Sequence, residues 1–464
     1  MRLASYYSKT FPFIGIITMI SVSFYSCKKF VEIEPPKDYA VAATIFDDDQ
    51  SAISAVAGLY SQLTSSELYI THGGISVFCG LAADEIINTA NNSTYDPFKT
   101  NSLTANNSVI TNRFYNRAYI YIYHANAIIT GLSKASTVTP AMSKQLMGEA
   151  KCLRAFLYFY LVNLYGDIPL ITSTDYKTNA TLPRASKETI YKQVTEDLLE
   201  AIELLPATYS TENRARINKW AAYALLSRVY LFTGQWAEAE SSATSVINAG
   251  VYGLVPLNNV FLPSSSETIW QIVPPPATNS AEGSAFLPSS GTARPTFALA
   301  SYLLADFEPG DQRNLASNWI RSNINGGQTY YYPYKYKVKS APSTQEYNIA
   351  IRLAEILLVR AEAFARQGKI EESQADLNAV RTRAGLTNTL AGSEPALLDA
   401  ILHERRTELF TEWGHRWFDL KRMGKIDMVL SAIKGTNWQS TDSLWPIPFA
   451  QIQLNSYLTQ NEGY

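Results

Sequence analysis

One stretch near the C-terminus begins like the helix of a zinc protease. His403 and Glu404 stand where such a helix carries its first metal ligand and its general base. Thr407, however, occupies the position of the second histidine ligand, one helical turn after the first. A single histidine on this turn supplies too few ligands to hold the metal, so the sequence excludes this class of hydrolase.

Other catalytic arrangements are also missing from the sequence. The chain has four histidines among 464 residues, and none accompanies a recognisable nucleophile motif such as GxSxG. Paired carboxylates such as Asp84 and Glu85 are expected in any chain with 41 acidic residues. Glycoside hydrolysis needs two carboxyl groups at a defined separation, which sequence alone does not reveal. We therefore expect a protein that is not an enzyme and that uses no metal or cofactor.

Acidic side chains recur at every fourth position of one C-terminal segment, with basic side chains close by. These residues are Glu404, Glu408 and Glu412, with Arg405, Arg406 and Arg416. Opposite charges at helical spacing pair along a helix or between helices. We interpret the group as buried or half-buried ion pairs that hold the C-terminal helices to the body. An acidic binding site is the alternative.

The chemistry that the sequence favours is non-covalent binding. Aromatic residues make up 12% of the chain and include 29 tyrosines, whose rings offer an apolar face and a hydroxyl. A sugar ring likewise has apolar C–H faces and a polar rim, and its hydroxyls need new hydrogen-bond partners when water leaves. We expect a shallow site with a Kd of about 1 μM to 1 mM. Packing between helices is the alternative role for these rings.

Two irregular segments provide the candidate ligand-binding residues. Residues 88–111 form a polar stretch rich in Asn, Ser and Thr, and residues 255–347 are rich in Pro, Ser, Gly and Tyr. The candidates are Tyr95, Phe98 and Asn101 in the first segment, and Trp319 and Arg321 in the second. Rings can stack under a sugar, while amide and guanidinium groups bond its hydroxyls, so we expect at least one of the five to contact ligand. For each residue singly, packing in the core or a loop is the alternative.

The N-terminus has the pattern of a bacterial lipoprotein signal. Arg2 and Lys9 precede an apolar run, and Cys27 follows it. The run is too short, and too interrupted by Ser and Thr, to span a membrane comfortably as a helix. Cleavage would remove residues 1–26, leave an extended tether over residues 27–45 and allow lipid on Cys27 to anchor the protein. An ordinary secretory signal with an incidental cysteine is the alternative.

Charge and cysteine content exclude other partners. The chain carries 39 basic and 41 acidic side chains, which gives no electrostatic support for a nucleic-acid partner. No CxxC or clustered Cys/His spacing indicates zinc. We expect Cys79 and Cys152 to be small buried hydrophobes rather than a disulfide or metal pair.

The periodicity of apolar residues predicts a mainly α-helical body, taken as a single domain over residues 46–464. Helices are predicted from Phe46 onward and over about 112–132, 141–165 and 187–205, with Ser186 as an N-cap. Two helix–turn–helix units near 218–249 and 352–381 have the tetratricopeptide pattern around turn glycines 234 and 368.

Tyrosine alternates with other residues between these two units. Tyr330, Tyr332, Tyr334 and Tyr336 follow a period of two, which predicts a short strand or hairpin arm with one aromatic face. That face either packs on the helices or contacts ligand.

Four stretches together resemble the SusD/RagB family. Residues 148–170 resemble its signature helix and residues 404–422 its C-terminal run. Residues 444–464 look like its terminus, and residues 27–36 are similar to its usual mature start. The resemblance covers the chain from end to end, and its motifs are long.

The resemblance implies an outward-facing, lipid-anchored outer-membrane protein that captures nutrients, usually glycans, and delivers them to a TonB-dependent SusC-like transporter. It implies a helical fold in which tetratricopeptide-like repeats form one half, packed with an irregular, loop-rich half containing short β segments. It also places a stacking aromatic and an amide near residues 88–111. Two alternatives stay open: a repeat-based interaction scaffold or lid without glycan affinity of its own, and a protein that binds peptide rather than glycan.

Overall fold

The computed structural model describes residues 45–90 and 92–464. The predicted signal, the tether and Cys27 therefore lie outside the described residues. Phe46–Tyr464 form one compact unit. Within the described part of the chain, no helix combines the length and apolar character needed to cross a membrane.

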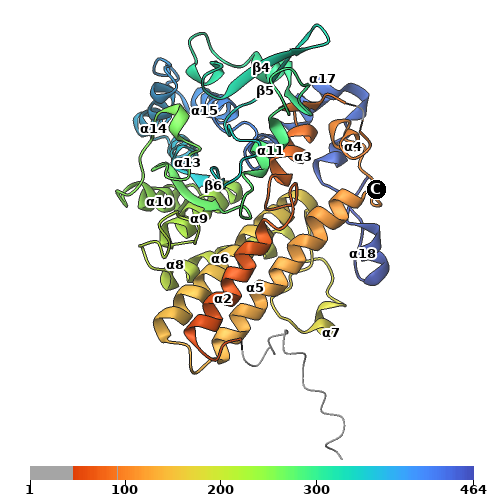
Figure 1. Ribbon diagram of the computed structural model, residues 1–464, viewed down its shortest axis with the longest axis vertical. Helices are drawn as coiled ribbons and strands as arrows, with labels where there is room; N and C mark the ends of the chain where they lie inside the picture. Colours follow the sequence, from red (N-terminus) through yellow and green to blue (C-terminus); the bar gives the residue numbers. More distant parts are fainter. Residues whose placement is uncertain (1–44, 91) are drawn as a thin grey trace, which may run out of the picture. The chain divides into compact units, whose positions relative to one another are not determined.

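Long helices make up most of this unit, and each packs beside the next (Figure 1). They are α2 (Asp49–Leu63), α5 (Asn116–Lys134), α6 (Pro140–Tyr165), α8 (Lys187–Leu204), α9 (Lys219–Thr233), α10 (Trp236–Ile247), α13 (Leu353–Arg366), α14 (Ile370–Arg383) and α15 (Glu394–Glu408). Contacts join α5 to α6, α6 to α8, α8 to α9, α9 to α10, α10 to α13, and α13 to both α14 and α15. Such neighbour-to-neighbour stacking is typical of helical repeats, and the predicted mainly α fold with tetratricopeptide-like helix pairs is confirmed.

The helix ends follow local chemistry. Asp48 caps α2 by accepting a hydrogen bond from the Ser51 N–H at 2.7 Å, which completes a capping box. Ser186 caps α8 as predicted, because its hydroxyl accepts from the Thr189 N–H. Gly234 ends α9 with a φ of 73°, a left-handed conformation that favours glycine, and so makes the tight turn into α10.

Helix α6 lies at the centre of the unit. Every residue from Gly148 to Tyr165 is buried, which is the pattern of a helix enclosed on all sides. Its charged members are paired: Arg154 contacts Asp197 at 2.6 Å and donates to the Asn126 side-chain oxygen at 2.7 Å. Cys152 of this helix and Cys79 are both buried free thiols, as predicted.

Short strands and short helices build the remaining part. Three antiparallel pairs form: β1 (Ile86–Asn88) with β3 (Phe297–Leu299), β2 (Thr268–Ile272) with β6 (Asn348–Arg352), and β4 (Ile320–Asn325) with β5 (Gln328–Pro333). The helices here are α3 (Gly74–Ala82), α4 (Asp96–Lys99), α7 (Tyr176–Asn179), α11 (Ala281–Phe286), α12 (Ser301–Leu304), α16 (His415–Arg422), α17 (Ile426–Lys434) and α18 (Phe449–Leu454). A π-helical turn (Ile110–Tyr115) leads into α5, and 3₁₀ turns cover Leu257–Asn259, Gln312–Asn314, Gly435–Asn437 and Ser440–Ser443.

The predicted tyrosine strand is confirmed only up to Pro333, where β5 ends. Tyr332 and Tyr336 are buried, and the Tyr336 hydroxyl accepts from the Ile349 N–H at 2.9 Å. These two rings therefore pack in the body, which is the first of the two roles that the sequence left open.

A buried network of ion pairs joins α15 to the rest of the body. Glu408 is fully buried and contacts Arg352 at 2.6 Å, Arg313 at 3.1 Å and Arg383. Glu404 contacts Arg313 at 2.5 Å. The predicted buried ion pairs are therefore confirmed for these acids.

The partners of the network differ from those nearest in sequence. Glu412 contacts Lys335 at 2.5 Å and Arg352 at 2.8 Å, rather than a neighbouring arginine. Instead, Arg405 contacts Asp419 at 2.7 Å and Arg416 contacts Asp84 at 2.8 Å. The pairs thus connect segments distant in sequence, which suits a role in fixing tertiary structure.

Candidate functional site

A pocket of about 470 Å³ lies beside the β1–β3 pair and the β4–β5 hairpin. Five segments line it: the end of α3 with β1, Lys99 of α4, β3 with α12, the start of β5, and the end of α17. Figure 1 places α3, α4, α17 and the hairpin in the same region. A recess of this size, walled by several elements, is typical of a small-ligand site.

Two tyrosine rings give the pocket exposed aromatic surface. Tyr302 of α12 is 51% exposed and Tyr331 of β5 is 43% exposed. Beside them, the Tyr330 hydroxyl donates to the Gln328 side-chain oxygen at 3.0 Å. Ile87 of β1 adds a half-exposed apolar side chain. Because the rings come from different elements, they offer a ligand two separate stacking surfaces.

Polar groups stand around these rings. Gln328 and Thr329 supply an amide and a hydroxyl from β5, and Ser301 supplies a hydroxyl from α12. The Lys434 ammonium donates to the carbonyls of Leu81 at 2.8 Å and Lys99 at 2.9 Å, tying the end of α17 to α3 and α4. Burial lowers the pKa of Lys434 to about 7.

Asp84 lines the pocket as an ionised, fully paired carboxylate. Arg416 bonds both of its oxygens, at 2.8 and 2.9 Å, and Arg406 contacts it at 2.7 Å. Burial alone would raise the pKa of Asp84, but the two arginines outweigh burial and hold that pKa below its usual value. A carboxylate held in this way serves the structure rather than acid–base chemistry.

Glu85 is buried next to Asp84 without an ion-pair partner among the described residues. Its carboxyl oxygens accept from the Thr411 N–H at 3.3 Å. Burial, with the Asp84 charge adding to it, raises the pKa of Glu85 to about 8. At neutral pH the carboxyl is therefore largely protonated.

This shift predicts a pH-dependent stability. Between pH 4.5, the ordinary value, and about 8, the folded chain keeps a proton on Glu85 that the unfolded chain has lost. The free energy of unfolding therefore falls as pH rises, by up to about 1.4 kcal/mol per pH unit from this group. The variant Glu85→Gln lacks this proton and should gain stability relative to the natural chain as pH rises. Urea unfolding of both proteins at pH 5 and pH 8 checks this prediction. An equal change in the free energy of unfolding of the two proteins between these pH values would contradict it.

The structure gives Phe98 and Trp319 packing roles in place of the predicted ligand contact. Both side chains are fully buried. The Phe98 ring lies 4.5 Å from Phe78 and 5.3 Å from Trp445. The Trp319 indole N–H donates to the Leu257 carbonyl at 3.0 Å. Neither ring has a surface on which a sugar could stack, because the folded core encloses both.

The other three predicted residues also lie outside the pocket lining. Tyr95 is half-buried, with its ring 4.9 Å from that of Phe297. Asn101 is buried, adopts a left-handed backbone with a φ of 54°, and donates to the Ala82 carbonyl at 3.3 Å. Arg321 is exposed and rests 5.0 Å from the Tyr334 ring. Of the five, Arg321 alone offers a well-exposed side chain.

Sequence reasoning missed most of the residues that line the pocket. Tyr330 belongs to the predicted aromatic face, for which ligand contact was one of the two suggested roles, whereas Tyr331 lies between the members of that face and was not singled out. Tyr302 follows an apolar stretch and carries no local signal. Its place is revealed only by the fold, in which α12 follows β3 and β3 pairs with β1 along the pocket.

Two family models match most of the chain. The model described as starch-binding associating with outer membrane matches residues 29–231. The model described as the SusD family matches residues 270–464. The chain belongs to the SusD/RagB family. The end-to-end resemblance seen in the sequence is thereby confirmed.

Individual SusD-like proteins show the same relationship. The SusD-like protein P25 of Formosa agariphila is 26% identical over 97% of this chain and 98% of its own length. The starch-binding protein SusD of Bacteroides thetaiotaomicron is 37% identical over 121 residues, which are 24% of this chain and 21% of that protein. A solved laminarin-binding SusD-like protein shares the fold with a TM-score of 0.74 and 24% identity, over 90% of this chain and 100% of the other.

The SusD-like chain offers no metal centre in the part that the structure describes. No cluster of three or more His, Cys, Asp and Glu side chains there could hold an ion. The pocket beside β1 and β3 is lined by aromatic, hydroxyl, amide and charged side chains.

Proposed function

We propose that this SusD-like protein is a non-catalytic, cell-surface lipoprotein that binds a glycan in the pocket lined by Tyr302 and Tyr331. The observation that carries the proposal is the pair of exposed rings above a rim of amide, hydroxyl and ammonium groups. Rings stack on the C–H faces of a sugar, and the rim replaces water around its hydroxyls. The names of two relatives, one starch-binding and one laminarin-binding, support a glucan as the first ligand to try.

Binding experiments on a ligand panel test this function. Calorimetry or affinity electrophoresis with starch, laminarin and other polysaccharides should reveal saturable binding to at least one, with a Kd of about 1 μM to 1 mM. A panel of peptides forms the second arm. Binding to peptides but not to polysaccharides would identify peptide as the ligand class. If the protein bound neither panel, the role of a scaffold or lid without glycan affinity would be favoured.

The proposal continues with delivery of the bound glycan to a TonB-dependent SusC-like transporter. Weak binding suits such a role, since a ligand held too tightly would leave slowly. Support comes from the family membership and from the description of the first family model, which names association with the outer membrane. Co-purification with a barrel protein in mild detergent, from cells that express both, is the test. Repeated isolation of the lipoprotein alone would count against the partnership.

The membrane anchor is proposed to be lipid on Cys27. The variant Cys27→Ala should lose incorporation of labelled palmitate and leave the outer-membrane fraction, because the acyl chains supply the membrane affinity. Cys79→Ala is the matched control, since Cys79 is a buried thiol in the body and should leave labelling unchanged. Equal labelling of Cys27→Ala and the natural chain would refute the anchor.

A further inference from the structure

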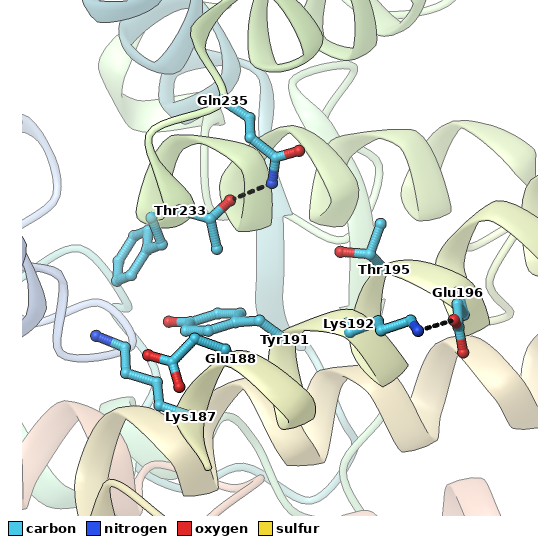
Figure 2. A pocket seen from close by; sticks show the side chains of 9 residues that line it. Lys187, Glu188, Tyr191, Lys192, Thr195, Glu196, Thr233 and Gln235 are labelled. Carbon is cyan, nitrogen blue, oxygen red and sulfur yellow. Dashed lines mark hydrogen bonds and ion pairs between the residues drawn. The ribbon is translucent and has the colours of Figure 1, made fainter.

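A second pocket, of about 600 Å³, lies at the ends of helices α6, α8 and α16. Lys187, Glu188, Tyr191 and Phe232 line it, and the same residues line a neighbouring groove of about 530 Å³. Figure 2 shows this groove, with Lys187 and Glu188 at one end and the Lys192–Glu196 pair at the other. The two recesses therefore adjoin, and they share no lining residue with the pocket of Tyr302 and Tyr331.

Lys421, in the last turn of α16, lines the second pocket without a carboxylate partner. Its ammonium donates to the Asn163 carbonyl at 2.5 Å, and no described acidic oxygen lies within ion-pair distance of it. Its neighbour Arg422 differs, because it contacts Glu362 at 2.5 Å and Asp419 at 2.8 Å. Burial, with the Lys187 charge adding to it, lowers the pKa of Lys421 to about 7.

Arg184 lines the same pocket and is held by neutral acceptors. Its guanidinium donates to the carbonyls of Asp167 at 2.7 Å and Thr459 at 3.1 Å, and to the Asn461 side-chain oxygen. Those bonds fix its position without neutralising its charge. The Lys187 ammonium also has no ion-pair partner among the described side chains, and it lies 5.7 Å from the Tyr191 ring.

Two acidic side chains also line the pocket, and both are exposed. Asp167 accepts from the Lys187 backbone N–H at 2.9 Å, so part of its charge is already engaged at the start of α8. Glu188 stands in the first turn of the same helix. Asp167 favours the charged form of Arg184, and Lys187 favours that of Glu188. Among the described residues, Lys421 is therefore the lining cation that is left without a nearby carboxylate.

We propose that this pocket binds an acidic sugar, with the anionic group held between Lys421, Arg184 and Lys187. Lys421 and Arg184 are half-buried, and a ligand carboxylate or sulfate would supply charge-assisted hydrogen bonds to these cations. Phe232, which is half-buried, lines the shared wall and gives the sugar ring an apolar surface. The volume is within the usual range for a small-molecule site.

Calorimetric titration with three small probes tests the site. Galacturonate offers a carboxylate, galactose 6-sulfate a sulfate, and galactose neither. Saturable binding of one acidic probe, with galactose silent, is the expected result, and the probe that binds identifies the anionic group. Equal binding of galactose, or no binding of either acidic probe, would overturn the proposal.

Variants locate the binding in this pocket. Lys421→Met keeps most of the length of the side chain, removes its charge and should weaken binding of the acidic probe about tenfold or more. Lys187→Met, at an exposed position, should weaken it as well and serves if Lys421→Met fails to fold. Lys192→Met is the matched control on the same helix, because Lys192 is exposed and lines only the groove. If both Lys421→Met and Lys187→Met kept the affinity of the natural chain for the acidic probe, the proposal would be wrong.

This second site is independent of the proposed glycan site. Tyr302→Ala combined with Tyr331→Ala should leave the affinity for the acidic probe unchanged. If no polysaccharide bound, the proposed glycan site would be wrong, but the acidic-sugar pocket would be unaffected. Loss of acidic-probe binding in the double tyrosine variant would contradict the acidic-sugar pocket.

Discussion

Replacement of Glu408 by alanine is expected to lower the free energy of unfolding by about 3–5 kcal/mol. The Glu408 carboxylate is fully buried and contacts Arg313, Arg352 and Arg383. The three arginines hold the pKa of Glu408 well below its usual range although burial opposes them. Its removal takes one carboxylate partner from the three buried arginines. A buried positive charge without enough negative charge around it destabilises the folded state. Urea unfolding followed by circular dichroism measures the loss.

A matched control separates this effect from loss of an acidic side chain in general. Glu196 forms an ion pair with Lys192 at 3.9 Å on the surface of α8. The variant Glu196→Ala should change the free energy of unfolding by less than about 0.5 kcal/mol, since water and salt screen such a pair. If Glu408→Ala cost no more than Glu196→Ala, the network would have no special role in stability.

The same network shows what sequence reasoning could and could not predict. Helical spacing of Glu404 and Glu408 correctly indicated buried ion pairs, because charges repeated on one face of a buried helix need partners. It did not identify those partners. Arg313 and Arg352 reach Glu408 from segments 95 and 56 residues away, and such pairs depend on tertiary packing that local spacing does not encode.

Helices were predicted closely for a similar physical reason. The expected helix over 141–165 is α6 (Pro140–Tyr165), and that over 187–205 is α8 (Lys187–Leu204). Apolar periodicity and the cap residue act within a few turns, so the sequence displays them directly.

The binding site was harder to predict, because residue type does not distinguish a stacking ring from a core ring. Phe98 and Trp319 lie in irregular segments, as a binding aromatic would, yet both are enclosed in the core. Tyr302 reaches the pocket because α12 directly follows β3, which pairs with β1 at the pocket wall. The candidate pocket takes lining residues from both irregular segments, whereas its individual side chains could be identified only from the fold.

Replacement of both pocket tyrosines is the decisive experiment for the proposed glycan site. Removal of one tyrosine ring that stacks on the glycan should lower the binding free energy by about 1.4 kcal/mol, which raises Kd about tenfold. Tyr302→Ala combined with Tyr331→Ala is therefore expected to weaken glycan binding about 100-fold. For a Kd that is already micromolar or weaker, this loss would abolish retardation in affinity gels.

Stability and a second surface tyrosine provide the controls. Tyr302 and Tyr331 are about half exposed, so their removal should change the free energy of unfolding by less than about 1 kcal/mol. Tyr176→Ala removes an even more exposed ring, 74% accessible and outside the pocket, and should leave glycan affinity unchanged. Full affinity in the double variant would move the site elsewhere, and Arg321 would then be the first residue to replace, because its guanidinium is exposed on the neighbouring strand β4.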